Sequence, residues 1–338
     1  MPSTLDKMTE QTQKIMSIAP TFSCQKKCEG CYLTTGVTKE MRDAELTEEE
    51  WFDVIKTGNE MGYTELGISW NPMPNSLDQI LKFSKYAWLR GMDVNITTTI
   101  DNDFIGLANR LEGELHEDGF FVQRSTHGRK LTISLSCDDI HGYSSLTDFI
   151  RQLQKSVDGK FITHETMKSN LHMNLNLLWT NGVFDWLLKS PREFKEGLWI
   201  LRETFDSIQH LMLKPVTLYK GGWDEFIMLY GEVFRDHSDI CIQGNGKDII
   251  GDAAMNSILG INKCPSIDYQ MLDIDPMGNI RICPENPKVI GIVRKKFSLG
   301  SLFSDENWRD EKGLDLTELI NNHAHECRKD KCICITGE

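Results

Sequence analysis

The chain has 338 residues, and its 37 lysines and arginines against 50 aspartates and glutamates give a formal net charge of −13 at pH 7. Its length allows one large domain or two smaller ones, and 26% charged with 40% hydrophobic residues is typical of a globular protein. An acidic chain is a poor binder of bulk nucleic acid. We find no apolar run of roughly 20 residues that would cross a membrane and no secretory signal, so we expect a cytoplasmic protein.

Strands alternate with helices from about residue 15 to residue 240. The first helix has the clearest start, because Thr47 and Glu50 have the spacing of a capping box. Six strand–helix units in series predict an α/β fold with a parallel sheet or a partial (β/α)6 barrel. We predict strands over residues 15–21, 64–70, 93–100, 130–136, 171–179 and 208–216, with helices that begin near residues 47, 76, 102, 145, 191 and 223.

Polar and apolar residues alternate along three of these strands. In residues 130–136, Thr132, Ser134 and Ser136 alternate with leucine and isoleucine, and residues 93–100 and 171–179 show the same pattern. A parallel strand covered on both faces would be apolar almost throughout. Two interpretations remain: a half-exposed antiparallel sheet, or an open barrel with a polar, ligand-binding inner wall. The interleaved helices favour the barrel.

The alternation of strands and helices stops after about residue 245. We predict a β-hairpin over residues 270–285, with its turn at 276–279. We also predict a helix over residues 316–327, before a cysteine-rich tail. We therefore expect two domains: an α/β domain over residues 1–245 and a small cysteine-bearing domain over residues 246–338.

Ten cysteines are unusual for such a chain. Because reducing compartments keep thiols free, clustered cysteines indicate a metal site or catalysis rather than disulfides. Cys24, Cys28 and Cys31 follow the first predicted strand and can converge on one inorganic group. A zinc ion would need a fourth ligand from elsewhere in the chain, whereas three thiolates suit a [4Fe–4S] cluster with one open iron.

The motif Cys-x3-Cys-x2-Cys after a first strand, followed by further strand–helix units, resembles the radical S-adenosylmethionine (SAM) enzymes. The resemblance extends over residues 15–240 and implies that Cys24, Cys28 and Cys31 hold a [4Fe–4S] cluster that binds SAM. It also implies reductive cleavage of SAM to a 5′-deoxyadenosyl radical, which abstracts hydrogen from a substrate. Such a reaction needs an electron donor such as flavodoxin or ferredoxin.

The same resemblance implies contacts to SAM. The family's aromatic residue falls here on Tyr32, after the last cysteine, and the usual Gly-Glu-Pro is replaced by residues 70–72, Trp-Asn-Pro. The usual Ser-Leu-Asp-Gly of the fourth strand is replaced by residues 134–137, Ser-Leu-Ser-Cys. Each polar side chain in these segments can equally well satisfy its neighbours. The candidate SAM contacts are Tyr32, Gly67, Ser69, Asn71, Ser134 and Asn176.

Five more cysteines lie in the last quarter of the chain. Two of them bracket the predicted hairpin, and Gly278 lies five residues before the second. This pattern resembles the SPASM and twitch appendages, which hold auxiliary [4Fe–4S] clusters, and the cysteine count suffices for one such cluster. A structural zinc site is the alternative; zinc would accept the imidazoles of His323 and His325, but we expect these two residues on a helix surface. The candidate ligands are Cys264, Cys283, Cys327 and Cys332, with Cys334 able to replace Cys332.

Cys137 and Cys241 stand apart from both groups. A buried free cysteine most often behaves as a small apolar residue. Cys137, however, is predicted at the carboxyl end of its strand, where active sites of parallel barrels form, and some radical SAM epimerases return a hydrogen atom from a thiol. We therefore treat both as candidate catalytic thiols, with acid–base candidates at Asp138, Asp139 and His141.

The leading prediction is a radical SAM enzyme that acts on a small polar metabolite, such as a sugar, nucleoside or amino-acid derivative, in a biosynthetic step. Only about 14 residues precede the first predicted strand, which we expect to be too few for a peptide-binding or cobalamin domain. Two alternatives are a radical SAM enzyme that epimerises or cross-links a peptide, and a non-enzymatic zinc or electron-transfer module.

Overall fold

The computed structural model defines the fold over most of the strand–helix region and part of the later chain. The residues that it describes are 14–26, 28, 31, 33–34, 36–71, 73, 76–117, 130–156, 171–178, 180–212, 240–242, 271–282, 289 and 291–293.

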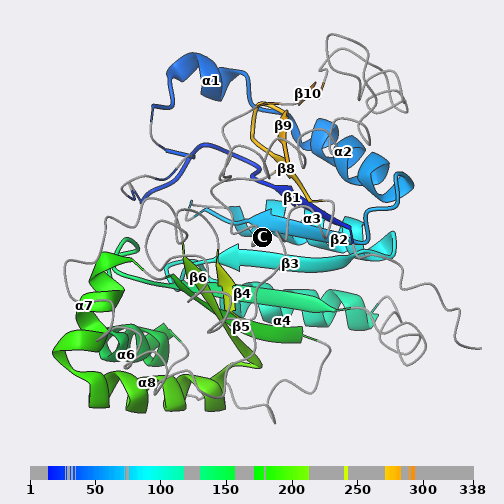
Figure 1. Cartoon of the computed structure of the whole chain (residues 1–338). Coiled ribbons are helices and arrows are strands. Elements are labelled where there is room, and N and C mark those ends of the chain that lie inside the picture. Colours follow the sequence, from blue (N-terminus) through cyan, green and yellow to red (C-terminus); the bar gives the residue numbers. More distant parts are fainter. Residues whose placement is uncertain are drawn as a thin grey trace, which may run out of the picture.

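One ten-stranded sheet forms the centre of these residues, in the order β10-β9-β8-β1-β2-β3-β4-β5-β6-β7 (Figure 1). From β1 to β7 each strand pairs in parallel with the next. The expected α/β fold with a parallel sheet is confirmed, the antiparallel alternative is wrong, and the described sheet stays open. These strands are β1 (Ile15–Ile18), β2 (Glu65–Ser69), β3 (Asp93–Thr98), β4 (Leu131–Cys137), β5 (Leu171–Leu178), β6 (Ser207–Met212) and β7 (Ile240–Ile242).

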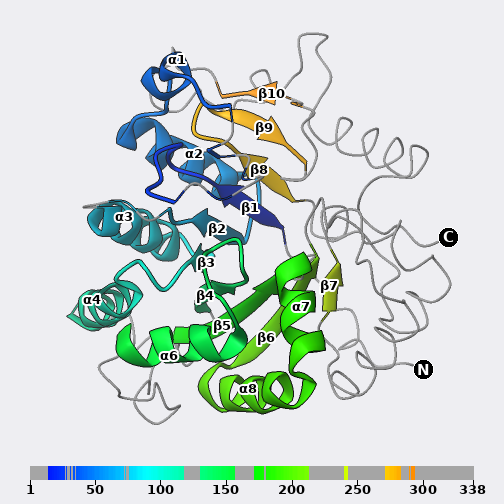
Figure 2. The same ribbon diagram turned by 90° about the vertical axis from the view of Figure 1, so that its left-hand side faces the viewer.

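Helices form an outer layer along one face of the curved sheet (Figure 2). The capping box is present, since Thr47 accepts from the Glu50 amide and Glu50 accepts from the Thr47 amide. The layer consists of α2 (Glu48–Glu60), α3 (Ser76–Leu89), α4 (Phe104–Glu117), α6 (Leu146–Ser156) and α8 (Pro191–Thr204). Two shorter helices, α1 (Lys39–Asp43) and α7 (Asn181–Lys189), were not predicted, and the helix expected near residue 223 lies outside the described residues. None of the described helices is long and apolar enough to span a membrane.

The strand alternation separates an apolar core from a polar face. Leu135 and Cys137 of β4 lie in one core cluster with Trp51 of α2 and Phe149 of α6, all with no exposed surface. Because successive side chains of a strand point to opposite faces, the polar residues of β4 lie on the face away from this core. The parallel register aligns them with polar neighbours in one row, Ser69, Thr97, Ser134 and Asn174.

The predicted hairpin is present and extends the main sheet. β8 (Leu272–Ile274) pairs in parallel with β1, and β9 (Asn279–Arg281) pairs with β8 and with β10 (Gly291–Ile292) in antiparallel fashion. The turn needs glycine at Gly278, where φ is +81° and a Cβ atom would lie 3.0 Å from the Val293 Cβ. The division into domains at residue 245 stays a prediction, with the hairpin built into the sheet of the first part.

This arrangement makes the hairpin part of the main core. The side chain of Ile274 has no exposed surface, whereas Ile292 on β10 is 56% exposed. Ile274→Ala should therefore lower the free energy of unfolding of the whole sheet by about 3 kcal/mol, and Ile292→Ala by less than about 0.5 kcal/mol. Urea denaturation followed by circular dichroism measures both. Equal stabilities of the two variants would show that the hairpin folds apart from the sheet.

Candidate active site

The three-cysteine motif forms a loop beyond the carboxyl end of β1. The sulfur-bearing side chains of Cys24, Cys28 and Cys31 are free and each is half-buried. The Cys31 amide donates to the Cys28 carbonyl at 3.3 Å, and the Thr34 amide donates to the Cys31 carbonyl at 3.1 Å. The first bond joins the second and third cysteines directly, and the second bond holds the chain just after the third.

Two side chains fix the beginning of this loop. The carboxylate of Glu45 accepts hydrogen bonds from the Thr21 hydroxyl at 3.0 Å and from the Phe22 amide at 2.8 Å. From the end of β2, Asn71 Nδ2 donates to the carbonyl oxygens of Thr21 at 2.9 Å and Ser23 at 3.3 Å. Asn71, predicted as a SAM contact, therefore uses its amide group to hold the backbone just before Cys24.

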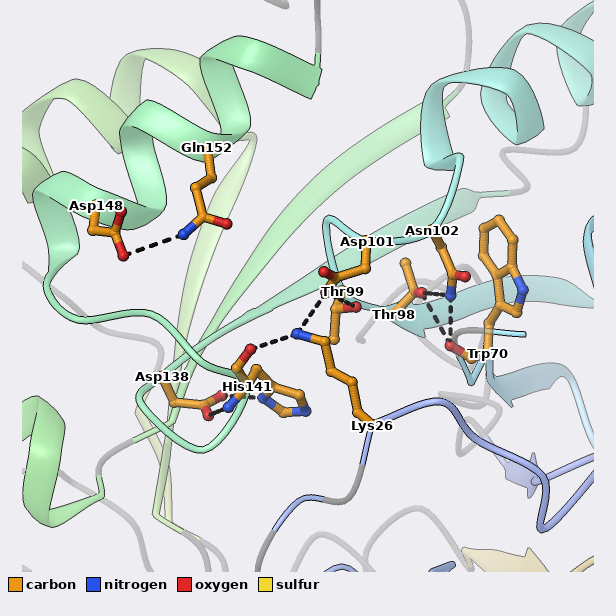
Figure 3. Close-up of polar contacts among 10 residues, drawn as sticks. All are labelled: Lys26, Trp70, Thr98, Thr99, Asp101, Asn102, Asp138, His141, Asp148 and Gln152. Atoms are coloured by element: carbon orange, nitrogen blue, oxygen red, sulfur yellow. Dashed lines mark hydrogen bonds and ion pairs between the residues drawn. The ribbon is translucent and has the colours of Figure 1, made fainter. Parts of the chain in front are cut away.

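A lysine inside the motif joins the loop to the ends of two further strands (Figure 3). The ammonium group of Lys26 forms an ion pair with Asp101, after β3, at 2.6 Å. It also donates to the backbone carbonyl of His141, after β4, and lies 5.5 Å from the centre of the Tyr143 ring. The cysteine loop thus lies across the carboxyl ends of β3 and β4.

The turn after β4 carries a buried carboxylate–imidazole pair. Asp138 has no exposed surface; its Oδ1 accepts from the His141 amide at 2.8 Å, and its Oδ2 lies 2.6 Å from His141 Nδ1. A carboxylate at Nδ1 favours the proton on that nitrogen, which makes Nε2 the acceptor of the neutral ring. The side chain of His141 is 20% exposed, so part of the ring remains accessible.

The adjoining end of β2 is also tied down. The Trp70 carbonyl accepts from the Thr98 hydroxyl and from Asn102 Nδ2, both at 3.0 Å (Figure 3). The indole Nε1 of Trp70 donates to Ser76 Oγ at 2.8 Å. These bonds fix the backbone immediately before Asn71 and therefore the anchor of the loop.

The thiols of the loop influence one another electrostatically. Burial, together with the neighbouring thiols of Cys31 and Cys24, raises the pKa of Cys28 to about 11. Burial also raises the pKa of Cys24, while the charge of Lys26 acts in the opposite direction on both. Three soft sulfur ligands that repel one another as thiolates fit an iron–sulfur cluster chemically, because bound iron relieves that repulsion. Over the described residues no three ligating side chains already form a metal-binding group.

The predicted SAM contacts on the polar face differ in whether their polar atoms already have hydrogen-bond partners. Ser134 has no exposed surface and donates to Asn95 Oδ1 at 2.9 Å. Asn176 of β5 is 5% exposed, and its Oδ1 is buried without a hydrogen-bond partner among the residues that the structure describes. Gly67 and Ser69 lie on β2, with Ser69 in the row of Ser134. Tyr32 lies outside the described residues.

The structure does not bring Cys137 to the polar face. Its side chain is fully buried in the apolar core, opposite Ser134 and Asp138, and burial raises its pKa well above the ordinary value. This placement favours the interpretation of Cys137 as a small apolar core residue. For Cys241 only the backbone, in β7, is described, and its catalytic role stays a prediction. The proposed auxiliary ligands Cys264, Cys283, Cys327, Cys332 and Cys334 lie outside the described residues.

Sequence reasoning did not find the residues that position the loop. Glu45, Lys26 and Asp101 each act through a partner distant in the chain, and none forms a local motif. The one available signal was the pair of lysines, Lys26 and Lys27, between two cysteines, where positive charge stabilises thiolates.

No protein-family model and no curated protein matches the chain. Among solved structures, a histidine-tagged anSMEcpe with bound AdoMet is similar with a TM-score of 0.47 and 12% identity, covering 82% of this chain and 74% of that chain. Native anSMEcpe with bound AdoMet has a TM-score of 0.45 and 12% identity, covering 88% and 81%. A GH138 enzyme targeting pectin rhamnogalacturonan II has a TM-score of 0.35 and 10% identity, covering 79% and 43%. TM-scores this low assign the chain to none of these families.

The raised pKa of Cys28 has a measurable consequence in the metal-free protein. At pH 8 a thiol with a pKa of about 11 is about one-thousandth thiolate, so alkylation by iodoacetamide should be slow and should accelerate until about pH 11. Mass spectrometry of the labelled peptides measures the rate, and buried Cys137 should stay unlabelled until the protein unfolds. A Cys28 rate that levels off near pH 8.5 would contradict this environment.

Proposed function

We propose that this chain is a radical SAM enzyme in which Cys24, Cys28 and Cys31 hold a [4Fe–4S] cluster that binds SAM. The observation that carries the proposal is the position of the cysteine loop, which Lys26 and Asn71 tie to the carboxyl ends of β2, β3 and β4. Open parallel sheets bind their ligands at this edge. The bound cluster would supply the electron that cleaves SAM.

The chain's own residues would then hold the motif in place and influence the loss of protons from its thiols. Glu45 and Asn71 fix the backbone before the first thiol, so the loop would lose less conformational entropy when a cluster binds. Because a ligating cysteine is a thiolate, Cys24 and Cys28 must lose their protons, and their raised pKa values oppose that loss. The nearby positive charge of Lys26 favours the loss of these protons.

Asn176 is the strongest candidate for a contact to SAM. Its buried carbonyl oxygen has no donor among the described residues, and such an unsatisfied acceptor costs about 1–3 kcal/mol. A hydroxyl or ammonium group of SAM would supply that donor. Ser134 is less available, because its hydroxyl already donates to Asn95. The row of Asn176 and Ser136 lies toward the carboxyl ends of β5 and β4, the edge that carries the cysteine loop.

We further propose a small polar metabolite as substrate, in a biosynthetic step in the cytoplasm, with flavodoxin or ferredoxin as electron donor. The buried polar face and the Asp138–His141 pair support a substrate with hydroxyl or amino groups. A radical SAM enzyme that modifies a peptide is the second candidate. Mass analysis of products from purified metabolites and peptides distinguishes the two.

We also propose that the later cysteines hold an auxiliary [4Fe–4S] cluster. Its ligands would be Cys264, Cys283, Cys327 and Cys332, with Cys334 as the substitute for Cys332. The support is indirect: the hairpin between the first two of these cysteines pairs with β1, the strand that leads into the cysteine loop. Two clusters would give about eight irons per chain and one cluster about four.

Anaerobic reconstitution with iron and sulfide tests the proposal. The wild-type chain should bind iron, turn brown and release 5′-deoxyadenosine from SAM under a reductant. Cys28→Ala removes a cluster ligand and should lower that release by more than about 100-fold, beyond the effect typical of outer-shell changes. Cys137→Ala is the matched control and should retain the activity, because that thiol lies in the apolar core.

Two outcomes would reject the assignment. A Cys28→Ala protein that still produces 5′-deoxyadenosine would show that this loop does not hold the reactive cluster. A wild-type chain that binds two zinc ions and cleaves no SAM would establish the zinc module instead.

A second test concerns Asn176. Replacing it with leucine removes the unsatisfied oxygen, so Asn176→Leu should be as stable to urea as the wild type or more so. The same change should weaken SAM binding to the reconstituted protein about tenfold, the effect of about one hydrogen bond. His172→Gln, on the same face at the other end of β5, is the control. Equal SAM affinity of Asn176→Leu and wild type, measured by equilibrium dialysis, would exclude the contact.

A further inference from the structure

Lys26 occupies a special position in the cysteine loop. The anchors at Glu45 and Asn71 hold only residues 21–23, before the first thiol. Between Cys24 and Cys28, Lys26 is the residue whose side chain joins the loop to the sheet, as far as the described part of the loop extends. Its side chain is only 22% exposed, although lysine is usually a solvated residue.

Three contacts converge on this one ammonium group, and Figure 3 shows two of them, those with Asp101 and with the His141 carbonyl. The Asp101 carboxylate lies at 2.6 Å, the His141 carbonyl accepts a hydrogen bond, and the Tyr143 ring lies within the range of a cation–π interaction. Asp101 is itself held by the Thr99 hydroxyl at 2.9 Å. An isolated exposed ion pair contributes little to stability, but a shared, partly buried group with three fixed partners restricts the position of the loop.

The contact to His141 also connects the loop to the carboxylate–imidazole pair. Lys26 binds the backbone carbonyl of the residue whose ring and amide are both held by Asp138. A displacement of the loop therefore either breaks this hydrogen bond or moves the turn after β4. Lys26 also lies two residues from Cys24 and two residues from Cys28 along the chain, and its positive charge acts to lower the pKa of both thiols.

We propose that Lys26 is the positioning residue of the cysteine loop, with two separable effects. Through Asp101 and the His141 carbonyl it fixes the loop across the ends of β3 and β4. Through its charge it stabilises the more negative, reduced form of a cluster held by the loop and so raises the reduction potential. The second effect rests on the proposed function, whereas the first does not.

Hydrogen exchange of the metal-free protein tests the first effect. Lys26→Met keeps the length of the side chain and removes its charge and hydrogen bonds, so the hydrogen-bonded amides of Cys31 and Thr34 should exchange about tenfold faster than in the wild type. Asp101→Asn should accelerate the same amides, and Lys26→Arg should restore slow exchange. Lys82→Met is the matched control, because it breaks an ion pair of 2.8 Å to Glu48 away from the loop.

The reduction potential of the reconstituted protein tests the second effect. In a titration followed by EPR, Lys26→Met should shift the potential to a more negative value, by about a tenfold change in the ratio of reduced to oxidised cluster, which corresponds to about 59 mV. Asp101→Asn keeps the ammonium group and removes a nearby negative charge, so its potential should not fall. Lys26→Arg should stay within about twofold of the wild type in that ratio.

The results separate the two proposals. Loop amides of Lys26→Met that exchange at the wild-type rate would overturn the positioning role, and an unchanged potential would overturn the electrostatic role. If the wild-type chain assembles no cluster, the proposed function fails, while the exchange measurement still decides whether Lys26 positions the loop. Urea denaturation of each variant confirms that the compared proteins are folded.

Discussion

Parallel pairing of consecutive strands is the constraint on which the site depends. Because β1 to β5 run in the same direction, the segments that follow them emerge at one edge of the sheet. Segments far apart in the chain therefore meet there: the cysteine loop after β1, Asn71 after β2, Asp101 after β3 and His141 after β4. The same alternation that buries one face of each strand against the helices leaves the polar face beside this edge.

The loop combines a firmly anchored backbone with three separate thiols. Glu45, Asn71 and Lys26 fix its backbone through long-range polar contacts, while the three thiols remain separate and burial raises the pKa of Cys24 and of Cys28. Binding of the proposed cluster would then displace protons and draw the sulfurs together, which would make its assembly dependent on pH. Cys137 is the last residue of β4 and so lies close to this edge, but its side chain is buried in the apolar core. A thiol at the carboxyl end of a strand is therefore not by itself a reactive one.

Local signals in the sequence predicted much of the fold. The alternation in β3, β4 and β5 and the capping box of α2 arise between neighbouring residues, and the turn at Gly278 needs a positive φ that glycine supplies. The α7 helix was missed because only Ser190 separates it from α8. The pairing of β8 with β1 and the contact of Lys26 with Asp101 were missed for a different reason: both join distant segments, and a single sequence carries no pattern for such pairs.

The central claim is that the cysteine loop presents an iron of its cluster to SAM. Pulsed EPR of the reduced, anaerobically reconstituted wild-type chain, with SAM labelled by 15N at the methionine amino group, tests this contact directly. The account predicts a hyperfine coupling between the cluster and the labelled nitrogen, which is absent when Cys28 is replaced by alanine. A wild-type cluster that binds SAM without such a coupling, or a coupling that persists in the Cys28→Ala protein, would contradict the account.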